Sequence, residues 1–129
     1  MALKANSCDE NIVSAGIQTK EYFFFKIRQT TYKARMIDIV FLESNKRKLT
    51  MHLVNGNKVE FYGKLKEVYQ EQLHDYGFFH IHASYVVNFE HIASLKFKEV
   101  KLAGGMSLPI SQQRRKEVRK AYLALYRDS

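Results

Sequence analysis

The sequence predicts an all-β domain with two appended helices, and three observations lead to that class. Short segments rich in aromatic and β-branched residues recur along most of the chain, separated by turn-forming residues. Apolar residues at helical spacing occur in only two places, 65–73 and 114–127. Strands do not alternate with long helices, so the pattern of a parallel α/β fold is missing.

The size of the chain fits a single domain. A length of 129 residues with 46% hydrophobic residues can fill one core of ordinary size. Residues 1–20 are small and mixed and show no hydrophobic period, so we expect a leader or the remnant of a linker there. The domain is expected to span residues 21–129, with the C-terminal helix starting near residue 114.

The first predicted strands are EYFFFKIR at 21–28 and TYKARMI at 31–37, with only Gln29 and Thr30 between them. Both segments are rich in aromatic and other β-favouring residues, and their closeness predicts that they pair. IDIVFLES at 37–44 is a nearly continuous apolar run, short enough for a buried strand. This part of the chain should therefore be entirely β.

The sequence predicts a hairpin over residues 48–62 and a short helix after it. Apolar residues alternate with polar ones in KLTMHLV at 48–54 and again in KVEFY at 58–62. NGN at 55–57 joins them, and Asn and Gly accept the positive φ that tight hairpin turns require. Apolar residues at helical spacing then predict one short helix over 65–73, ended by DYG at 75–77.

The remainder returns to strand character and ends in a helix. FFHIHASYVVN at 78–88, HIASLKF at 91–97 and KEVKL at 98–102 are predicted strands, and AGG turns the chain into MSLPI at 106–110. Pro109 has no N–H, so the last strand should lie at a sheet edge or end there. An apolar stripe over 114–127 predicts the C-terminal helix, with Ser111 as a candidate upstream cap.

Segment 78–88 carries two histidines that could bind a metal. As one continuous strand it would place Phe79, Ile81, Ala83, Tyr85 and Val87 on one face, and His80, His82, Ser84 and Asn88 on the other. Two imidazoles at this spacing can share a metal, but a site needs further ligands, and only His52, His91 or scattered carboxylates are on offer. Half-exposed histidines of a sheet are the favoured interpretation, so no metal is predicted.

The charge of the chain points to a polyanionic partner. The formal net charge is +8, and the excess is concentrated in KRK at 46–48 and RRK at 114–116, with Arg119 and Lys120 behind it. Clustered Lys and Arg suggest nucleic acid, because each neutralised phosphate releases counterions. The alternative from charge alone is an ordinary solvated face.

Several classes of protein are disfavoured. Cys8 is the only cysteine, which excludes an internal disulfide within the chain and a multi-cysteine zinc module and fits a reducing compartment. No stretch approaches the roughly 20 apolar residues of a membrane span. Ser84 has no nucleophile elbow around it, and no phosphate-binding glycine motif is present. We therefore expect a cytoplasmic protein that is not an enzyme and has no cofactor, small-molecule substrate or membrane contact.

Four motifs resemble one known family. IDIVFLES, VEFYGKLKEV, FFHIHASYVVNFEHIASL and LPIS occur in the order and spacing typical of LytTR domains, bacterial DNA-binding output domains of response regulators. The resemblance runs from about Phe24 to Val118, most of the chain, and is densest at 79–88. It implies elongated antiparallel sheets of about ten short strands, with a short internal helix.

The resemblance also implies a mode of action. LytTR domains insert loops, not a recognition helix, into successive major grooves of bent DNA, at paired direct repeats that allow a dimer on DNA. Such a domain usually follows a receiver domain of a two-component system, so this chain would be an excised output domain or a stand-alone regulator.

Carried onto this chain, the family's three contact regions and their neighbours are the predicted DNA-binding residues. The regions follow the strand ending FLES, the strand FFHIH and the strand LPIS. A fourth, at 62–66, matches positions near backbone contacts, and the basic block at 114–115 adds two arginines. The full set is Asn45, Lys46, Arg47, Lys48, Tyr62, Lys64, Lys66, His82, Ala83, Ser84, Ser111, Gln112, Gln113, Arg114 and Arg115.

The resemblance also changes the expectation for 78–88. It implies that the strand ends near His82, that Ala83 and Ser84 form a turn toward DNA, that His82 orients this turn, and that Asn88 fixes backbone at the far end of the next strand.

Two residues depart from the family pattern. Ala83 stands where Arg or Asn is usual, and Gln112 stands where Arg is common. Ala83 offers only an apolar contact, for example to a thymine methyl, whereas Gln112 or Gln113 suits the N6 and N7 of adenine. These departures favour more phosphate and shape readout. They also motivate the alternative of an interaction or sensing module that has weak or lost DNA binding.

Overall fold

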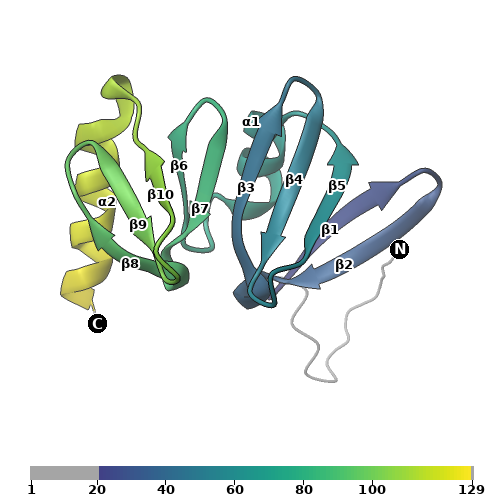
Figure 1. The fold of residues 1–129 in the computed structure, drawn as a ribbon, viewed down its shortest axis with the longest axis horizontal. Coiled ribbons are helices and arrows are strands. Elements are labelled where there is room, and N and C mark those ends of the chain that lie inside the picture. Colours follow the sequence, from purple (N-terminus) through teal and green to yellow (C-terminus); the bar gives the residue numbers. More distant parts are fainter. Residues whose placement is uncertain (1–20, 129) are drawn as a thin grey trace.

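The structure is a computed structural model that describes residues 21–128. Ten strands in this range form three antiparallel sheets, which lie in a row along the long axis of the molecule (Figure 1). The predicted all-β class, with elongated antiparallel sheets, a short internal helix and a C-terminal helix, is confirmed. The expected leader at 1–20 lies outside the described residues.

The N-terminal strands pair as predicted, with a turn one residue earlier than expected. β1 (Tyr22–Ile27) and β2 (Thr30–Arg35) form a two-stranded sheet in which Ile27 faces Thr30. The turn is therefore Arg28–Gln29, with Arg28 at a φ of 58°. Thr30 joins the strand because a β-branched residue suits an extended backbone better than a tight turn.

The central sheet begins as a meander of three strands. β3 (Ile39–Asn45), β4 (Lys48–Leu53) and β5 (Lys58–Tyr62) pair in succession, and the alternation predicted for β4 is confirmed because Leu49 and Met51 are both 0% exposed. Gly56 in the NGN turn has a φ of +88°, as the hairpin prediction requires.

Two more strands complete the central sheet, whose order is β5-β4-β3-β7-β6. α1 (Leu65–Val68) continues into a π-helical turn at Tyr69–Leu73 and carries the chain from the β5 edge to the β6 edge. The segment ends as predicted by DYG, at Gly77, whose φ is +81°. β6 (Phe78–His82) and β7 (Tyr85–Asn88) then pair with each other, and β7 pairs with β3.

Segment 78–88 is a hairpin, so its reading as one continuous strand is wrong. Ala83 and Ser84 form the turn, and Ala83 is exposed there instead of lying inward with Ile81 and Tyr85. The polar row is divided as well, since Asn88 is buried at the opposite end of β7. The expectation from the family resemblance, a strand that ends at His82, is confirmed.

The C-terminal part forms a three-stranded sheet covered by a helix. β8 (Ile92–Leu95), β9 (Glu99–Leu102) and β10 (Ser107–Pro109) have the order β10-β9-β8, and Pro109 is the last residue of an edge strand, as predicted. α2 (Arg115–Asp128) follows and lies at the outer end of the row (Figure 1). None of the helices within residues 21–128 has the length and apolarity needed to cross a membrane.

Ser111 is not the side-chain cap of α2, which corrects the sequence prediction. A 3-10 turn at Gln112–Arg114 lies between Ser111 and the helix, and the Ser111 side chain makes no capping hydrogen bond. The hydroxyl of Ser111 instead accepts a long hydrogen bond of 3.5 Å from Nη1 of Arg114. The extra turn moves the start of the helix beyond the reach of the hydroxyl.

Two hydrophobic clusters lie on opposite faces of the central sheet. Adjacent residues of β3 and of β6 point to different clusters, Leu42 and Phe78 to one, Phe41 and Phe79 to the other. The first cluster is shared with the β1–β2 hairpin and α1, and the second with the three-stranded sheet and α2 through residues such as Val118. The central sheet is thus buried on both faces, so the turns at the ends of its strands are the parts that reach solvent.

Asn88 bonds three backbone groups and so ties segment 36–39 to segment 88–90 at one end of the central sheet. It is 2% exposed, and its Nδ2 donates to the carbonyls of Met36 at 3.0 Å and Ile39 at 2.9 Å. Its Oδ1 accepts from the N–H of Glu90 at 3.1 Å. The expectation that Asn88 fixes backbone is confirmed, and we call this the anchored end of the sheet.

Candidate nucleic-acid interface

The β3–β4 turn carries three basic side chains into solvent. Asn45 and Lys48 form the last strand pair, which leaves Lys46 and Arg47 at the tip. Lys46 has a left-handed backbone with a φ of 62°, and its carbonyl accepts a hydrogen bond of 3.1 Å from the Ser44 hydroxyl. Lysine is uncommon in this conformation, in which Asn or Gly is favoured. Lys46 therefore adds a positive charge to the turn at some cost in backbone strain.

The β6–β7 turn is short, neutral and held by a histidine. His82 pairs with Tyr85, and Nδ1 of His82 accepts a hydrogen bond of 3.0 Å from the N–H of Ser84. Because Nδ1 is the acceptor, the proton of a neutral His82 ring lies on Nε2. The expected role of His82 in orienting the turn is confirmed, and Ala83 is left exposed at the tip.

The segment between β10 and α2 brings two glutamines and two arginines to the same end. Gln112 and Gln113 are exposed, whereas Arg114 and Arg115 are half-buried. Nε of Arg115 donates to the carbonyl of Ile110 at 3.2 Å, and its guanidinium lies 5.7 Å from the ring centre of Phe97. Arg115 therefore has a structural task in addition to its charge.

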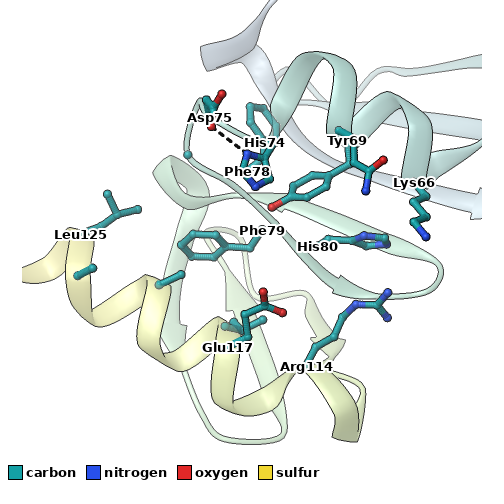
Figure 2. Close-up of a pocket in the computed structure, with 15 residues that line it drawn as sticks. Lys66, Tyr69, His74, Asp75, Phe78, Phe79, His80, Arg114, Glu117 and Leu125 are labelled. Carbon is teal, nitrogen blue, oxygen red and sulfur yellow. Dashed lines mark hydrogen bonds and ion pairs between the residues drawn. The ribbon is translucent and has the colours of Figure 1, made fainter.

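The residues around the end of β5 form the fourth segment. Tyr62 is 78% exposed and pairs with Lys48 across the strands. Lys64 lies 3.9 Å from Glu67, an exposed pair of the kind that contributes little stability. Lys66, one residue into α1, faces the β6 side together with His80 (Figure 2).

Three backbone hydrogen bonds join these four segments side by side. The N–H of Gly63 donates to the carbonyl of Arg47, that of Ser44 to Ser84, and that of Ser111 to Ile81, each at 2.9 Å. The turns and the start of α2 consequently lie along one long side of the molecule, at the top in Figure 1. The fifteen predicted residues belong to four segments that are distant in sequence, and the structure brings these segments into a single row.

The row is strongly basic, and we call it the cationic end. Its acidic neighbours make only exposed contacts, such as the 3.5 Å pair of Lys48 with Glu60. Such pairs exchange readily for a phosphate partner. The basic side chains of the cationic end are Lys46, Arg47, Lys48, Lys64, Lys66, Arg114 and Arg115.

Two lysines that the sequence analysis did not select border the cationic end. Lys96 and Lys98 flank Phe97 in the turn between β8 and β9, and all three are exposed. The N–H of Ile110 donates to the carbonyl of Lys98 at 2.9 Å, which holds this turn beside the start of α2. Their only signal in the sequence is a pair of lysines around an aromatic residue.

The histidines do not form a metal site in the described part of the chain. No group of three or more His, Cys, Asp or Glu residues within 21–128 is arranged to hold an ion. His52 instead bonds Glu43 at 2.6 Å and stacks on Phe41 at 4.0 Å, and His91 donates to the carbonyl of Ile37 at 2.6 Å. These side chains have structural partners of their own.

Comparisons with known proteins agree with this arrangement. The family model of the LytTr DNA-binding domain matches residues 29–123. A similar solved structure is the LytTr DNA-binding domain of a methyl-accepting/DNA response regulator from Bacillus cereus, with a TM-score of 0.64 and 19% identity over 78% of this chain and 95% of that chain. At that identity the likeness shows the fold. No curated protein matches the chain.

Proposed function

Since the chain belongs to the LytTR family of DNA-binding domains, we propose that it is a sequence-specific transcriptional regulator of double-stranded DNA. It would be the output domain of a bacterial two-component response regulator and would act in the cytoplasm. It inserts the loops of its cationic end into successive major grooves, at paired direct repeats on which two copies can bind. The proposal assigns the domain no catalysis and no cofactor.

The observation that carries the proposal is the alignment of four segments in one row. The row crosses the five strands of the central sheet and the start of α2, roughly 25 Å at about 4.8 Å per strand. Successive major grooves on one side of a duplex repeat every ~34 Å. Long side chains at both ends of the row, such as Lys64 and Arg114, extend its reach toward that repeat.

The side chains of the row suggest a division of labour. Lys46, Arg47 and Lys48 neutralise phosphates or approach guanine edges, and Ser84 binds a phosphate. Gln112 or Gln113 reads adenine through a bidentate amide contact, and Ala83 packs on a thymine methyl. Much of the affinity then comes from phosphate contacts, and specificity combines a few base contacts with the shape of the DNA.

Titration of labelled duplexes against salt tests DNA binding. A selection from a random pool at low salt supplies the duplex. With about five to seven phosphates neutralised, log K against log salt should have a slope of roughly −4.5 to −6.3. Undetectable binding to every pool member at low salt would contradict the proposal and favour the interaction or sensing module.

Base readout is tested by Gln112→Ala. Loss of one bidentate contact should reduce discrimination at one base position about tenfold and leave the salt slope unchanged. Repeating the selection with this variant gives the measurement, and Lys116→Ala on the exposed side of α2 is the control. A selected motif identical to that of the parent domain would remove Gln112 from base readout.

A further inference from the structure

A groove that shares only Lys66 and Arg114 with the proposed DNA contacts runs between the two helices. It has a volume of about 650 Å³, and its walls are the helical segment 66–75, strand β6 and the inner side of α2 (Figure 2). β6 is an edge strand of the central sheet, so no further strand of residues 21–128 occupies this space. The volume lies in the range of small-molecule sites.

The groove is polar and basic at one end and apolar at the other. Lys66, His80 and Arg114 converge at the end nearest the cationic end, as Figure 2 shows. Phe79 and Leu125 line the other end, where two small residues, Ala121 and Ala124, leave the space open. A molecule that fills the groove must therefore combine a charged group with an apolar body.

His80 has an unmet hydrogen-bonding atom at the basic end. Its Nε2 is buried and has no hydrogen-bond partner among the described residues. Burial, followed by the charge of Arg114, lowers the pKa of His80 to about 4, so the ring is neutral at pH 7. A buried polar atom without a partner is unfavourable, and a ligand that supplies one removes this cost.

The other polar groups fix where a negative charge can lie. Burial and then the charge of Glu117 raise the pKa of Tyr69, whose hydroxyl therefore keeps its proton and can donate. Asp75 is engaged by His74 at 2.8 Å. The Glu117 carboxylate repels an anion from the middle of the groove, which leaves the end with Lys66 and Arg114 as the favourable position.

From this polarity we propose that the groove binds a small organic anion with an apolar body. The anionic group lies between Lys66 and Arg114 and accepts a hydrogen bond from Nε2–H of the neutral His80 ring. The apolar body extends along Phe79 toward Leu125. The charge complementarity at one end and the apolar lining at the other together select this class. A neutral apolar molecule and a small inorganic anion each satisfy only half of the site.

Binding in the groove should weaken DNA binding. Lys66 and Arg114 belong both to the groove and to the cationic end, so an anion held between them competes with phosphates for the same charges. This coupling rests on the proposed function, whereas the binding itself does not. The two claims are separated by measuring ligand binding without DNA.

Sodium octanoate is a suitable probe for the site. Amide NMR spectra of the full chain should show saturable shifts at His80, Arg114 and Ala121, with a dissociation constant on the order of 1 mM for a ligand of this size. Octyl phosphate in parallel distinguishes a carboxylate head from a phosphate head. Acetate and 1-octanol, which carry only the head or only the tail, should bind at least about tenfold more weakly.

Two variants test the two ends of the groove. Arg114→Gln should weaken octanoate about tenfold, because it removes a charge-assisted hydrogen bond. Ala124→Leu, at an exposed helical position, should fill the apolar end and abolish binding without unfolding the domain. Lys120→Gln is the matched control on α2, since Lys120 is exposed and does not line the groove. Unfolding in urea verifies that each variant is folded.

Three results would overturn the inference. Shifts absent from the groove, or equal for octanoate and 1-octanol, would remove the anion site. Shifts that grow with protein concentration and without ligand would assign the groove to a second copy of the chain. The coupling has its own test: if DNA affinity is unchanged when octanoate saturates the groove, only the coupling is overturned. If the domain binds octanoate but no DNA, only the proposed function is contradicted.

Discussion

The two ends of the central sheet are built from different chemistry. At the anchored end, one buried amide bonds three backbone groups of two segments, and no charged side chain takes part. At the cationic end, backbone hydrogen bonds join neighbouring segments, but the side chains point into solvent and several are basic. Stability and binding are thus separated along the strands, so that a change at one end should leave the other property largely intact.

The largest effect on stability is expected at the anchored end, from Asn88→Ala. The change removes the side-chain donor from the carbonyls of Met36 and Ile39, of which the first keeps the N–H of Ile39, and the acceptor from the N–H of Glu90. It should lower the free energy of unfolding by about 3 kcal/mol. Unfolding in urea measures it. Asn55→Ala, in an exposed turn where Oδ1 accepts from the N–H of Asn57, is the control and should cost at most about 1 kcal/mol. Equal losses would mean that Asn88 is not a special anchor.

The next effect is expected at the cationic end, from the joint replacement of Lys46, Arg47 and Lys48 by Ala. Three lost phosphate contacts should weaken DNA binding about 100-fold near physiological salt and make the salt slope less negative by about 3. The same titration of fluorescent duplexes measures both.

A control with an equal loss of charge makes that prediction specific. Lys26, Lys58 and Lys101 are exposed and lie outside the four segments of the row, so their joint replacement by Ala should change the slope by less than 1. If both triple variants lose affinity equally, the net charge and not the cationic end drives binding.

The next effect is expected from the protonation of His80, which burial and then the charge of Arg114 disfavour. Burial and Arg114 lower its pKa from 6.5 to about 4, so the unfolded chain binds more protons between these values. Stability should consequently fall as the pH drops from 6.5 to 4 and then level off. Because the ring is only half-buried, we expect a loss of about 1 kcal/mol. His80→Phe should remove this part of the pH profile, and an unchanged profile would rule His80 out.

The smallest effect is expected from Lys46→Gly. Glycine adopts the φ of 62° without steric cost, so the hairpin should gain about 0.5–1 kcal/mol in stability, while one charge is lost from the DNA contact. Thermal unfolding and duplex titration give the two numbers. A stabilised variant with weaker binding would show that the turn sacrifices stability for charge, and a destabilised one would contradict it.

Local features of the sequence predicted most of the strands and hairpins. The alternation of Leu49 and Met51 and the NGN turn depend only on neighbours, and the structure confirms both. The pairing of β3 with β7, which places two distant hairpins side by side, has no local signal. It is decided by how both faces of the sheet pack, which periodicity does not describe.

The candidate site was predicted from the family resemblance more than from its residues. The two basic blocks were visible as charge, but nothing in the chain alone showed that they meet. Lys96 and Lys98 were missed because their turn contains no Gly, Pro or Asn and reads as strand. The predicted Ser111 cap is wrong because a 3-10 turn separates Ser111 from α2. The spacing of apolar residues does not distinguish such a turn from the first turn of an α-helix.

Pro109 has a consequence for the behaviour of the protein at high concentration. It ends β10, a three-residue edge strand that lies beside β6, and offers no N–H to an incoming strand. A proline at this position therefore disfavours the addition of a further strand, including one from a second copy, at this edge of the sheet.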